Sequence, residues 1–397
     1  MARRFSRSFT QQEPLSEAAI EAAVAVLRHG RLHRYNLTEG EAGEVALLEE
    51  AFAAFTGARF ALAVASGGYA LATALRALQV GPGEPVLTNA FTLAPVPGAI
   101  ASLGARPVLV EVTSDLVIDL GHLEARIAGT GARVLLLSHM RGHICDMDRL
   151  MAICDGAGVA VIEDCAHTMG AAWNGVASGR HGAMACYSTQ TYKHLNSGEG
   201  GLLISDDPEL MARAILLSGS YMMYLRHRAA PGPEHFEGLL AEMPNVSGRM
   251  DALRAAILRP QLTELPDRVA RWAELYRALE AGLCGCPGIA LIERPAAERF
   301  VGSSFQFRLP GWPPERIADF LGRTAARGVE LKWFGAEQPQ GFTSRYVHWG
   351  YAAPEPLPQT DRVLAGLIDL RLPLTFSPAD CHEIAAILVE EMAADRA

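Results

Sequence analysis

An acidic strand end and a lysine-bearing loop are the parts of this chain best suited to chemistry. Residues 161–164 form an apolar run that ends in acid at Asp164, and the loop 188–194 carries Lys193, followed by the glycine-rich run 197–201. A lone acid or a lone lysine is common. Together they supply an amine that can form a Schiff base and a carboxylate that can keep a ring nitrogen protonated. The pattern therefore predicts a site for pyridoxal 5′-phosphate.

A glycine turn could bind the phosphate of such a cofactor. Residues 60–65 predict a short strand and residues 70–78 a helix, and the turn 66–69 between them reads Ser-Gly-Gly-Tyr. A helix that starts at such a turn directs free backbone N–H groups at its contents, which suits a phosphate. A purely structural cap is an equally good interpretation of this turn alone.

The elements that must position these residues follow a βα rhythm. Strands are expected at 60–65, 85–87, 107–110, 134–137, 159–162, 183–187 and 201–204. Such alternation predicts an α/β protein with a mostly parallel sheet, whose ligands bind at the carboxyl ends of the strands. The segments expected at these ends are 66–69, 89–92, 138–141, 164–167 and 188–193.

The second half of the chain predicts a smaller unit. Residues 250–283 have a long helical pattern, with regular runs on either side of Pro260 and Pro266, and they would connect the two units. The remainder suggests a small α+β domain, with strands at 304–309 and 329–331 and helices at 314–327 and 378–394. We therefore expect a large α/β domain over 1–265, with an N-terminal helix at 14–29, and a small domain over 266–397.

Composition excludes several classes of partner. The 397 residues carry a net charge of −9 with both signs mixed, which argues against nucleic acid and anionic membranes. No run approaches the roughly 20 apolar residues of a membrane span, and the segment Met1–Ser6 lacks the apolar core expected of a signal peptide. The seven scattered cysteines suggest reduced thiols of a cytoplasmic protein. Cys284-Gly-Cys286 has no second ligand pair nearby, so no metal site is expected.

Several stretches resemble the DegT/DnrJ/EryC1/StrS aminotransferase family, the sugar-type members of the fold-type I enzymes that use pyridoxal phosphate. The most similar are VIEDCAHTMGA, YSTQTYKHLNSGEGG, ASGGYALATALRAL, SHMRGHICDMDRLM and GRMDALRAAI. The resemblance implies an aminotransferase that takes nitrogen from glutamate or glutamine. It also implies that a keto group of a sugar, nucleotide-sugar or related polyol receives the nitrogen, through an internal aldimine on Lys193.

The resemblance also implies roles for individual residues. Lys193 would carry the cofactor and shuttle a proton, rather than being a solvated lysine, and Asp164 would pair with the ring nitrogen, rather than capping the next helix. His167 would contact the phenolic oxygen, although a merely packed histidine is a real alternative. The cofactor's phosphate would be bound by Ser188 and by the backbone of Gly67, Gly68 and Tyr69.

An aromatic residue that stacks on the ring is also implied, and Phe91 lies near its place in the sequence. The stacking position itself holds Leu93, so a plain core role for Phe91 is an even alternative.

Departures from the family pattern concern the surroundings of the cofactor. Tyr192 and His194 flank the lysine where threonine and asparagine are usual, and Gly68 stands where a threonine is usual. Arg141 stands where tyrosine or phenylalanine is common; its guanidinium could bind a substrate carboxylate or phosphate, or be a surface or interface arginine. Tyr192, His194 and Arg141 are thus substrate-binding candidates.

A further departure affects the segment that reaches a second subunit in the family. It reads Asn-Val-Ser-Gly-Arg-Met over 245–250, two residues longer than usual. Arg249 matches well and is a candidate substrate-binding residue. Asn245, or alternatively Ser247, would touch the partner's cofactor. The resemblance therefore implies a homodimer with shared active sites.

Two other functions stay open at this point. The first is a lyase or dehydratase of the same fold, in which family members replace the lysine by histidine; the retained Lys193 disfavours it, while the adjacent His194 keeps it open. The second is a non-catalytic regulatory protein, which would have no need of both Lys193 and Asp164.

Overall fold

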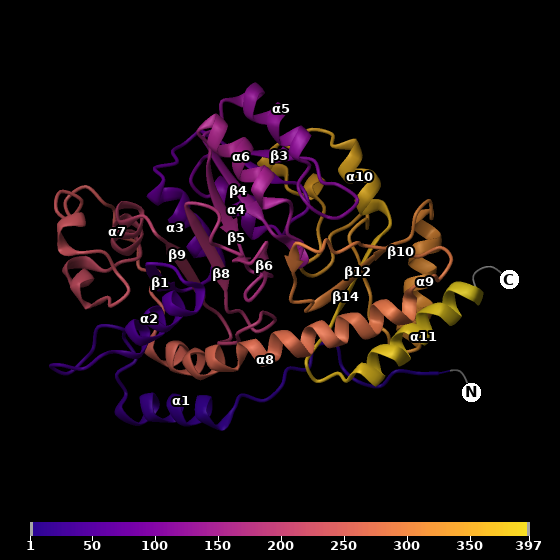
Figure 1. Ribbon diagram of the computed structural model, residues 1–397, viewed down its shortest axis with the longest axis horizontal. Coiled ribbons are helices and arrows are strands. Elements are labelled where there is room, and N and C mark those ends of the chain that lie inside the picture. The colour runs from indigo at the N-terminus through magenta and orange to yellow at the C-terminus, as the bar shows by residue number, and fades with distance from the viewer. Residues whose placement is uncertain (1–2, 395–397) are drawn as a thin grey trace.

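The centre of the molecule is a seven-stranded sheet, seen in a computed structural model that describes residues 3–394 (Figure 1). The strand order is β1-β9-β8-β5-β4-β2-β3. The pairs from β8 to β3 are parallel, whereas β9 runs antiparallel to both neighbours. The strands are β1 (Phe60–Val64), β2 (Pro85–Asn89), β3 (Arg106–Val110), β4 (Val134–Ser138), β5 (Ala160–Asp164), β8 (Met184–Ser188) and β9 (Gly201–Ser205). The predicted mostly parallel α/β fold is confirmed.

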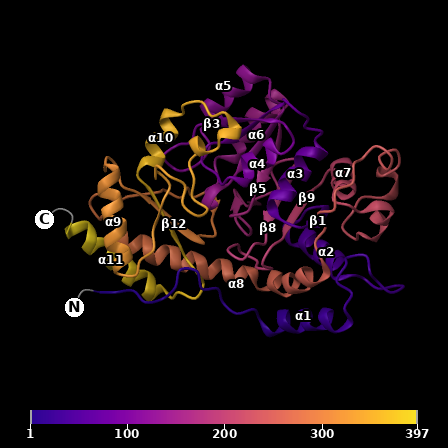
Figure 2. The ribbon, with the colours of Figure 1, turned by 180° about the vertical axis from the view of Figure 1, so that it is seen from behind.

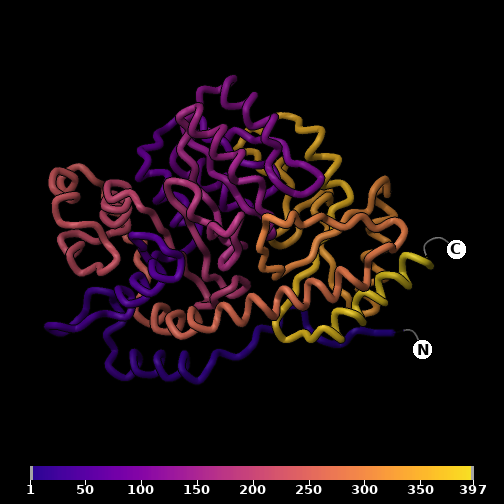
Figure 3. Tube along the Cα trace, viewed as in Figure 1, coloured from indigo at the N-terminus to yellow at the C-terminus, as the bar shows by residue number. Residues whose placement is uncertain are grey.

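Helices cover both faces of this sheet because its strands are apolar on both sides, as parallel strands usually are. One face packs on α3 (Gly67–Ala77), α4 (Pro95–Ala101) and α7 (Pro208–Leu217). The other packs on α2 (Glu44–Thr56), α5 (Leu120–Thr130), α6 (Met147–Ala157) and α8 (Ala252–Leu283). In Figure 3, α7 and the 3-10 helix η2 (Tyr221–Arg226) form a lobe at the end of the molecule opposite the chain termini.

A smaller unit follows in the chain. Its antiparallel sheet has the order β10-β12-β14-β13, from β10 (Ala290–Leu291), β12 (Ser304–Arg308), β13 (Lys332–Trp333) and β14 (Leu367–Arg371). Its helices are α9 (Pro314–Ala326), α10 (Pro358–Ala365) and α11 (Pro378–Ala394). A third small sheet joins the units, since β11 (Glu298–Arg299) pairs with β6 (Ala172–Trp173), and β6 pairs with β7 (Val176–Ala177).

The helix α8 runs along both units as one continuous rod (Figure 1). Pro260 and Pro266 lie inside it, although an interior proline costs a helix about 3 kcal/mol. Packing against α1 (Glu17–His29), α2 and α11 compensates for that cost. The expected domain boundary at 265/266 falls inside this helix, and the division into 1–265 and 266–397 stays a prediction.

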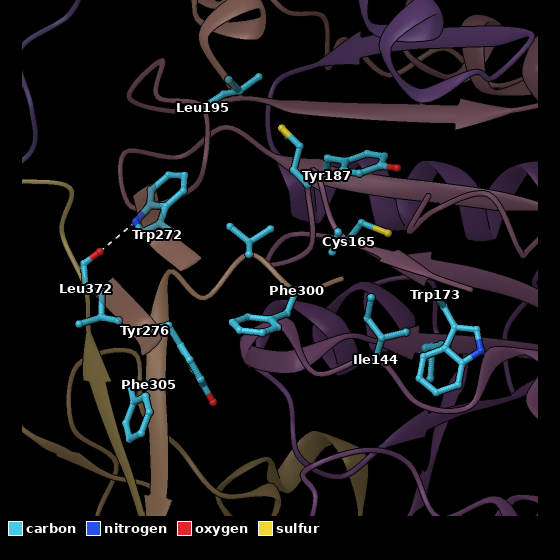
Figure 4. Close-up of a cluster of buried hydrophobic side chains, with 14 of the residues drawn as sticks. Ile144, Cys165, Trp173, Tyr187, Leu195, Trp272, Tyr276, Phe300, Phe305 and Leu372 are labelled. Carbon is cyan, nitrogen blue, oxygen red and sulfur yellow. Dashed lines mark hydrogen bonds between the residues drawn. The ribbon is translucent and has the colours of Figure 1, made fainter. Parts of the chain in front are cut away.

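Two contacts tie the units together around α8. The indole N–H of Trp272 donates to the carbonyl of Leu372 at 2.9 Å, within the apolar cluster of Figure 4. The N-terminal segment packs on the small unit, where Phe5 and Phe9 contact the ring of Phe376. Figure 2 accordingly shows the two termini close together beside α11. The expected 1–265 domain thus includes an N-terminal segment that packs on the other unit.

Candidate active site

A cavity of about 450 Å³ lies at the carboxyl edge of the large sheet, within the roughly 300–1,000 Å³ typical of small-molecule sites. The segments that follow β1, β2, β4, β5 and β8 all line it, as the strand-end argument predicted. The small unit closes the other side with β12, β13 and β14. The polar lining residues include Ser66, Thr92, Ser138, Arg141, Asp164, His167, Ser188, Gln190, Tyr192, Lys193, Lys332 and Arg371.

Asp164 ends β5 and is held in a fixed orientation. Its Oδ2 accepts a hydrogen bond from the hydroxyl of Ser138 (2.9 Å), which accepts one from Thr92 (2.7 Å). Its Oδ1 accepts from the backbone N–H of Ala166 (3.1 Å). Asp164 is buried and lines the cavity. A carboxylate fixed in this way can bind a protonated ring nitrogen.

Lys193 lies in the loop after β8, with its Nζ 2.8 Å from Nε2 of His167. Burial lowers the pKa of Lys193 to about 7; the carboxylate of Asp164 acts in the opposite direction, and Arg141 and Arg371 add to the lowering. Burial and the neighbouring Lys193 also hold the pKa of His167 well below its usual value. At neutral pH a large fraction of the amine is therefore uncharged, as a nucleophile must be.

The glycine turn provides a close approach of backbone to the end of β8. A Cβ on Gly67 would lie 2.9 Å from the Cβ of Ser188, so a larger side chain would fill the space between them. Gly67 and Gly68 begin the 11-residue helix α3 and line the cavity with Ser188. A helix N-terminus, two glycines and a serine hydroxyl suit a phosphate. These residues fit pyridoxal phosphate, with Asp164 and Lys193 further along the cavity.

Tyr69 differs from the expectation. Its backbone N–H donates to the side chain of Ser66 (3.1 Å), which caps α3, so that this N–H already has a partner. Its hydroxyl donates to the carbonyl of Val246 (2.6 Å) and holds the segment 244–248 instead of pointing into the cavity. The predicted phosphate contact of Tyr69 is therefore not supported by its hydrogen bonds.

Phe91 is a core residue. It is buried and packs edge-on against Phe334, with ring centroids 5.0 Å apart. Leu93 lines the cavity instead. The core interpretation of Phe91 fits the structure, and its proposed stacking role does not.

His194 points away from the cavity. Its Nε2 lies 3.1 Å from the hydroxyl of Ser303, and its ring packs edge-on against Trp272. Burial and Lys193 lower the pKa of His194 to about 3. His194 is therefore neutral and packs on the side of the lysine loop that faces away from the cavity. Tyr192 does line the cavity, with the guanidinium of Arg371 3.8 Å from its ring centroid.

Asn245 and Arg249 lie away from the cavity of their own chain. Asn245 is exposed, and Arg249 donates through Nη1 to the carbonyl of Gly219 (2.6 Å). Gly248 packs against Tyr69, where a Cβ would overlap the ring. The contact of Asn245 or Ser247 with a partner's cofactor stays a prediction.

Arg141 lines the cavity, and two further cations beside it were missed from the sequence. Arg141 pairs with the buried Asp369 (3.0 Å), while Lys332 lies in β13 and Arg371 ends β14. One compositional signal could have found Lys332, because the chain has only two lysines, Lys193 and Lys332. Both line this cavity.

Glu163, next to Asp164, is a second residue whose role sequence reasoning missed. It is fully buried and points to the opposite face of the sheet, where it accepts from four donors: Nε2 of His139 and the backbone N–H groups of Gly179, His181 and Gly182. His139, Glu163 and Cys165 are the group of possible metal ligands found among residues 3–394. Since its oxygens already have these partners, Glu163 acts as an anchor for β5.

Within residues 3–394, no helix combines the length and the apolar character that crossing a membrane requires.

A fixed carboxylate, a loop amine with a lowered pKa and a glycine turn around one cavity define an α/β enzyme of the aminotransferase type. The chain belongs to the DegT/DnrJ/EryC1/StrS aminotransferase family, whose sequence model matches residues 15–389. This confirms the resemblance found in the sequence. The enzymes of this family depend on pyridoxal phosphate.

Individual relatives agree with this assignment. The chain is 30% identical to a 3-amino-5-hydroxybenzoate synthase of Amycolatopsis mediterranei, over 88% of this chain and 90% of that protein. It is 33% identical to a dTDP-3-amino-3,4,6-trideoxy-alpha-D-glucose transaminase of Streptomyces venezuelae, over 69% of this chain and 68% of that protein. The crystal structure of a 3-amino-5-hydroxybenzoic acid synthase superposes with a TM-score of 0.83 at 26% identity, covering 99% of this chain and 100% of that one.

Proposed function

We propose that this chain binds pyridoxal 5′-phosphate and transfers an amino group from glutamate or glutamine to a keto group of a sugar, nucleotide-sugar or related polyol. The observation that carries the proposal is one cavity lined by Lys193, Asp164 and the turn at Gly67 and Gly68. The relatives' names support a carbohydrate-like acceptor.

Each residue has a defined task in this proposal. Asp164, fixed by Ser138, would keep the ring nitrogen protonated, and Ser188 with the start of α3 would bind the phosphate. When bound, the cofactor supplies an electron sink for the charge left on the substrate carbon. In each half of the reaction, Nζ of Lys193 would accept a proton from one carbon and deliver it to another, so that the amine ends each half in its starting protonation state.

His167 acts on the amine of Lys193 in the present geometry. The 2.8 Å contact holds Nζ in a hydrogen bond, and a neutral imidazole can accept from it without repelling it. We propose that His167 orients Lys193, and that it also contacts the cofactor.

We further propose that two chains associate through the face that includes the segment 245–250. Exposed apolar side chains gather beside this segment, on η2 and at Val246. Exposed apolar clusters of this kind mark interfaces. Their members are Tyr221, Met222, Leu225 and Val246, with exposed fractions of 55%, 68%, 65% and 44%. Light scattering should give twice the chain mass of 42.6 kDa, and Leu225→Glu should give the single-chain mass.

A cytoplasmic location is part of the proposal. All seven cysteines are free thiols and six of them are buried, as in proteins of reducing compartments.

The lyase alternative is weakened by the position of His194. A histidine that replaced the lysine would have to face the cavity, whereas His194 packs on Trp272 behind the loop. The regulatory alternative predicts neither turnover nor a need for a neutral amine.

Labelling tests the proposal directly because the chain has two lysines. Protein reconstituted with the cofactor should be yellow, and borohydride should attach the label to the peptide that contains Lys193. Lys332→Arg is the matched control and should keep the label, while Lys193→Arg should lose it and lower activity about a thousandfold or more. Glutamate or glutamine should then convert the bound cofactor to its pyridoxamine form. A colourless protein that cannot be reconstituted would refute every catalytic interpretation.

A further inference from the structure

Three cations converge on one wall of the cavity. Arg141 follows β4, Lys332 begins β13 and Arg371 ends β14, so both units of the chain contribute. The chain otherwise uses arginine for its cations, and its second lysine lies here.

The carboxylate of Asp369 pairs with two of these cations. Asp369 is fully buried; its Oδ2 lies 3.0 Å from Nη2 of Arg141 and 3.8 Å from Nζ of Lys332. Its Oδ1 accepts from the side-chain amide of Gln306 (2.7 Å). Within residues 3–394, Arg371 forms no ion pair and stacks on Tyr192 instead. Among residues 3–394, Asp369 is the carboxylate that pairs with these cations, so the cluster of four side chains carries more positive than negative charge.

The pKa values of Lys332 and Arg371 reflect this positive charge. Burial, together with Arg141 and Arg371, lowers the pKa of Lys332 to about 8, although Asp369 and Glu330 oppose the change. Burial and Arg141 lower the pKa of Arg371. Arg141 has a buried Nε without a hydrogen-bond partner and a left-handed backbone (φ 56°), a strained conformation for a residue other than glycine. A buried cation with an unsatisfied donor favours the binding of an anion.

The cations also lie close to the reacting amine. Tyr192, under Arg371, is the chain neighbour of Lys193. Gly142, next to Arg141, packs on the carbonyl of His167, where a Cβ would lie 2.9 Å from the oxygen. An anion bound here would thus lie close to the reacting amine, and a cavity of about 450 Å³ that must also hold the cofactor favours a compact substrate.

We infer that the amino acceptor is a compact keto compound with its own carboxylate, bound by Arg371, Lys332 and Arg141. The inference rests on the proposed function and narrows it. In a transaminase, donor and acceptor use one cavity in turn, so the glutamate donor would use the same cations. A neutral acceptor would leave the surplus positive charge of this cluster without a bound anion.

Binding measurements on the cofactor-loaded protein distinguish an acidic acceptor from a neutral one and from a nucleotide-sugar. Calorimetric titrations should compare 5-keto-D-gluconate, D-fructose and UDP-glucose as acidic, neutral and diphosphate-bearing probes. We expect the keto acid to bind at least about tenfold more tightly than fructose, the effect of one hydrogen bond between charged groups. Arg371→Gln and Lys332→Gln should each remove most of that preference. Arg141 is left intact because its loss would isolate the buried Asp369.

The control variant is Arg149→Gln, on the exposed surface of α6, which removes one positive charge outside the cavity and should change neither affinity. Equal binding of the keto acid and fructose would overturn the inference. The inference would also fail if UDP-glucose bound more tightly than the keto acid and this binding depended on Arg371. It would fail as well if Arg371→Gln and Lys332→Gln weakened the binding of glutamate but not that of the keto acid. If the protein does not take up pyridoxal phosphate, the proposed function fails. The affinities for the three probes would still show whether the three cations prefer a carboxylate.

Discussion

The Nζ of Lys193 lies 2.8 Å from Nε2 of His167, so the amine that sequence reasoning assigned to the chemistry has an imidazole as its immediate partner. Burial makes both groups favour their neutral forms. The carboxylate of Asp164, which also lines the cavity, opposes this effect and raises the pKa of Lys193.

The neutral amine leads to a pH prediction for cofactor uptake. Only uncharged Lys193 can attack the cofactor's carbonyl, and its pKa is about 7. The uncharged fraction then rises from about one tenth at pH 6 to about nine tenths at pH 8. The initial rate of cofactor incorporation, followed by absorbance, should therefore increase about tenfold over this range. A rate that is constant between pH 6 and 8 would contradict the lowered pKa.

Two substitutions should move this pH profile in opposite directions. The carboxylate of Asp164 raises the pKa of Lys193, so Asp164→Asn should shift the midpoint to lower pH. The guanidinium of Arg371 lowers that pKa, and Arg371→Gln should shift the midpoint to higher pH. The same absorbance assay measures both, and shifts of equal sign would be inconsistent with the electrostatics of the cavity.

His167 should be replaceable only by a residue that accepts a hydrogen bond. His167→Gln keeps an acceptor for Nζ of Lys193, whereas His167→Ala removes it. We expect the alanine variant to lose about tenfold or more in kcat, and the glutamine variant to lose less. The pH midpoint of cofactor uptake distinguishes a role in orienting the amine from general destabilisation, since only the first would move it. Equal activity of both variants would exclude the role.

Gly67 should be essential for the phosphate site. Gly67→Ala places a methyl group 2.9 Å from the Cβ of Ser188, so one of the two must move. Affinity for pyridoxal phosphate, measured by fluorescence titration, should fall about tenfold, the effect of one charge-assisted hydrogen bond. Gly81→Ala is the matched control, because a Cβ there meets no atom within 4 Å. If both variants bind the cofactor like the parent, the turn does not form the phosphate site.

Glu163→Gln should destabilise the fold. Its carboxylate accepts from four donors in a fully buried position, and an amide would direct a donor at one of them. We expect a loss of about 2–4 kcal/mol in the free energy of unfolding, measured with urea. Glu50→Gln, in a half-exposed pair with Arg228, should stay within about 0.5 kcal/mol.

The same carboxylate should contribute to acid sensitivity. Burial alone would raise the pKa of Glu163, but the hydrogen bonds from His139 and the backbone hold it below the usual value of 4.5. Since the folded-state pKa is lower than the unfolded one, the stabilisation is present above about pH 4.5 and is lost as the pH falls through the folded-state value. Glu163→Gln should thus remove part of the stability difference between pH 6 and pH 3.

The resemblance in sequence was enough to find Lys193, Asp164 and Ser188, because these residues belong to contiguous stretches with a recognisable spacing. The strand ends were predictable for a similar reason: apolar runs define strands, and parallel strands bring their carboxyl ends to one edge. His167 was identified as well, but its contact with Lys193 was not.

Side-chain direction was harder to predict. Phe91 and Leu93 are two residues apart, and only the packing of Phe91 on Phe334 decides which one is core. His194 follows Lys193 directly and nevertheless faces the opposite way, toward Trp272. Neighbours in a loop share a position in the chain but not a direction in space.

The sequence by itself determined the family, the α/β architecture, and the acid, amine and glycine turn of the site, since each depends on local pattern. Only the tertiary structure decided that Arg141, Lys332 and Arg371 face one cavity around Asp369. These residues come from distant parts of the chain, and their contacts exist only because the small unit folds back over the edge of the large sheet. Spacing along the chain carries no record of such contacts, which is why Arg141 was a candidate from the sequence alone, whereas its grouping with Lys332 and Arg371 was not apparent before the fold was known.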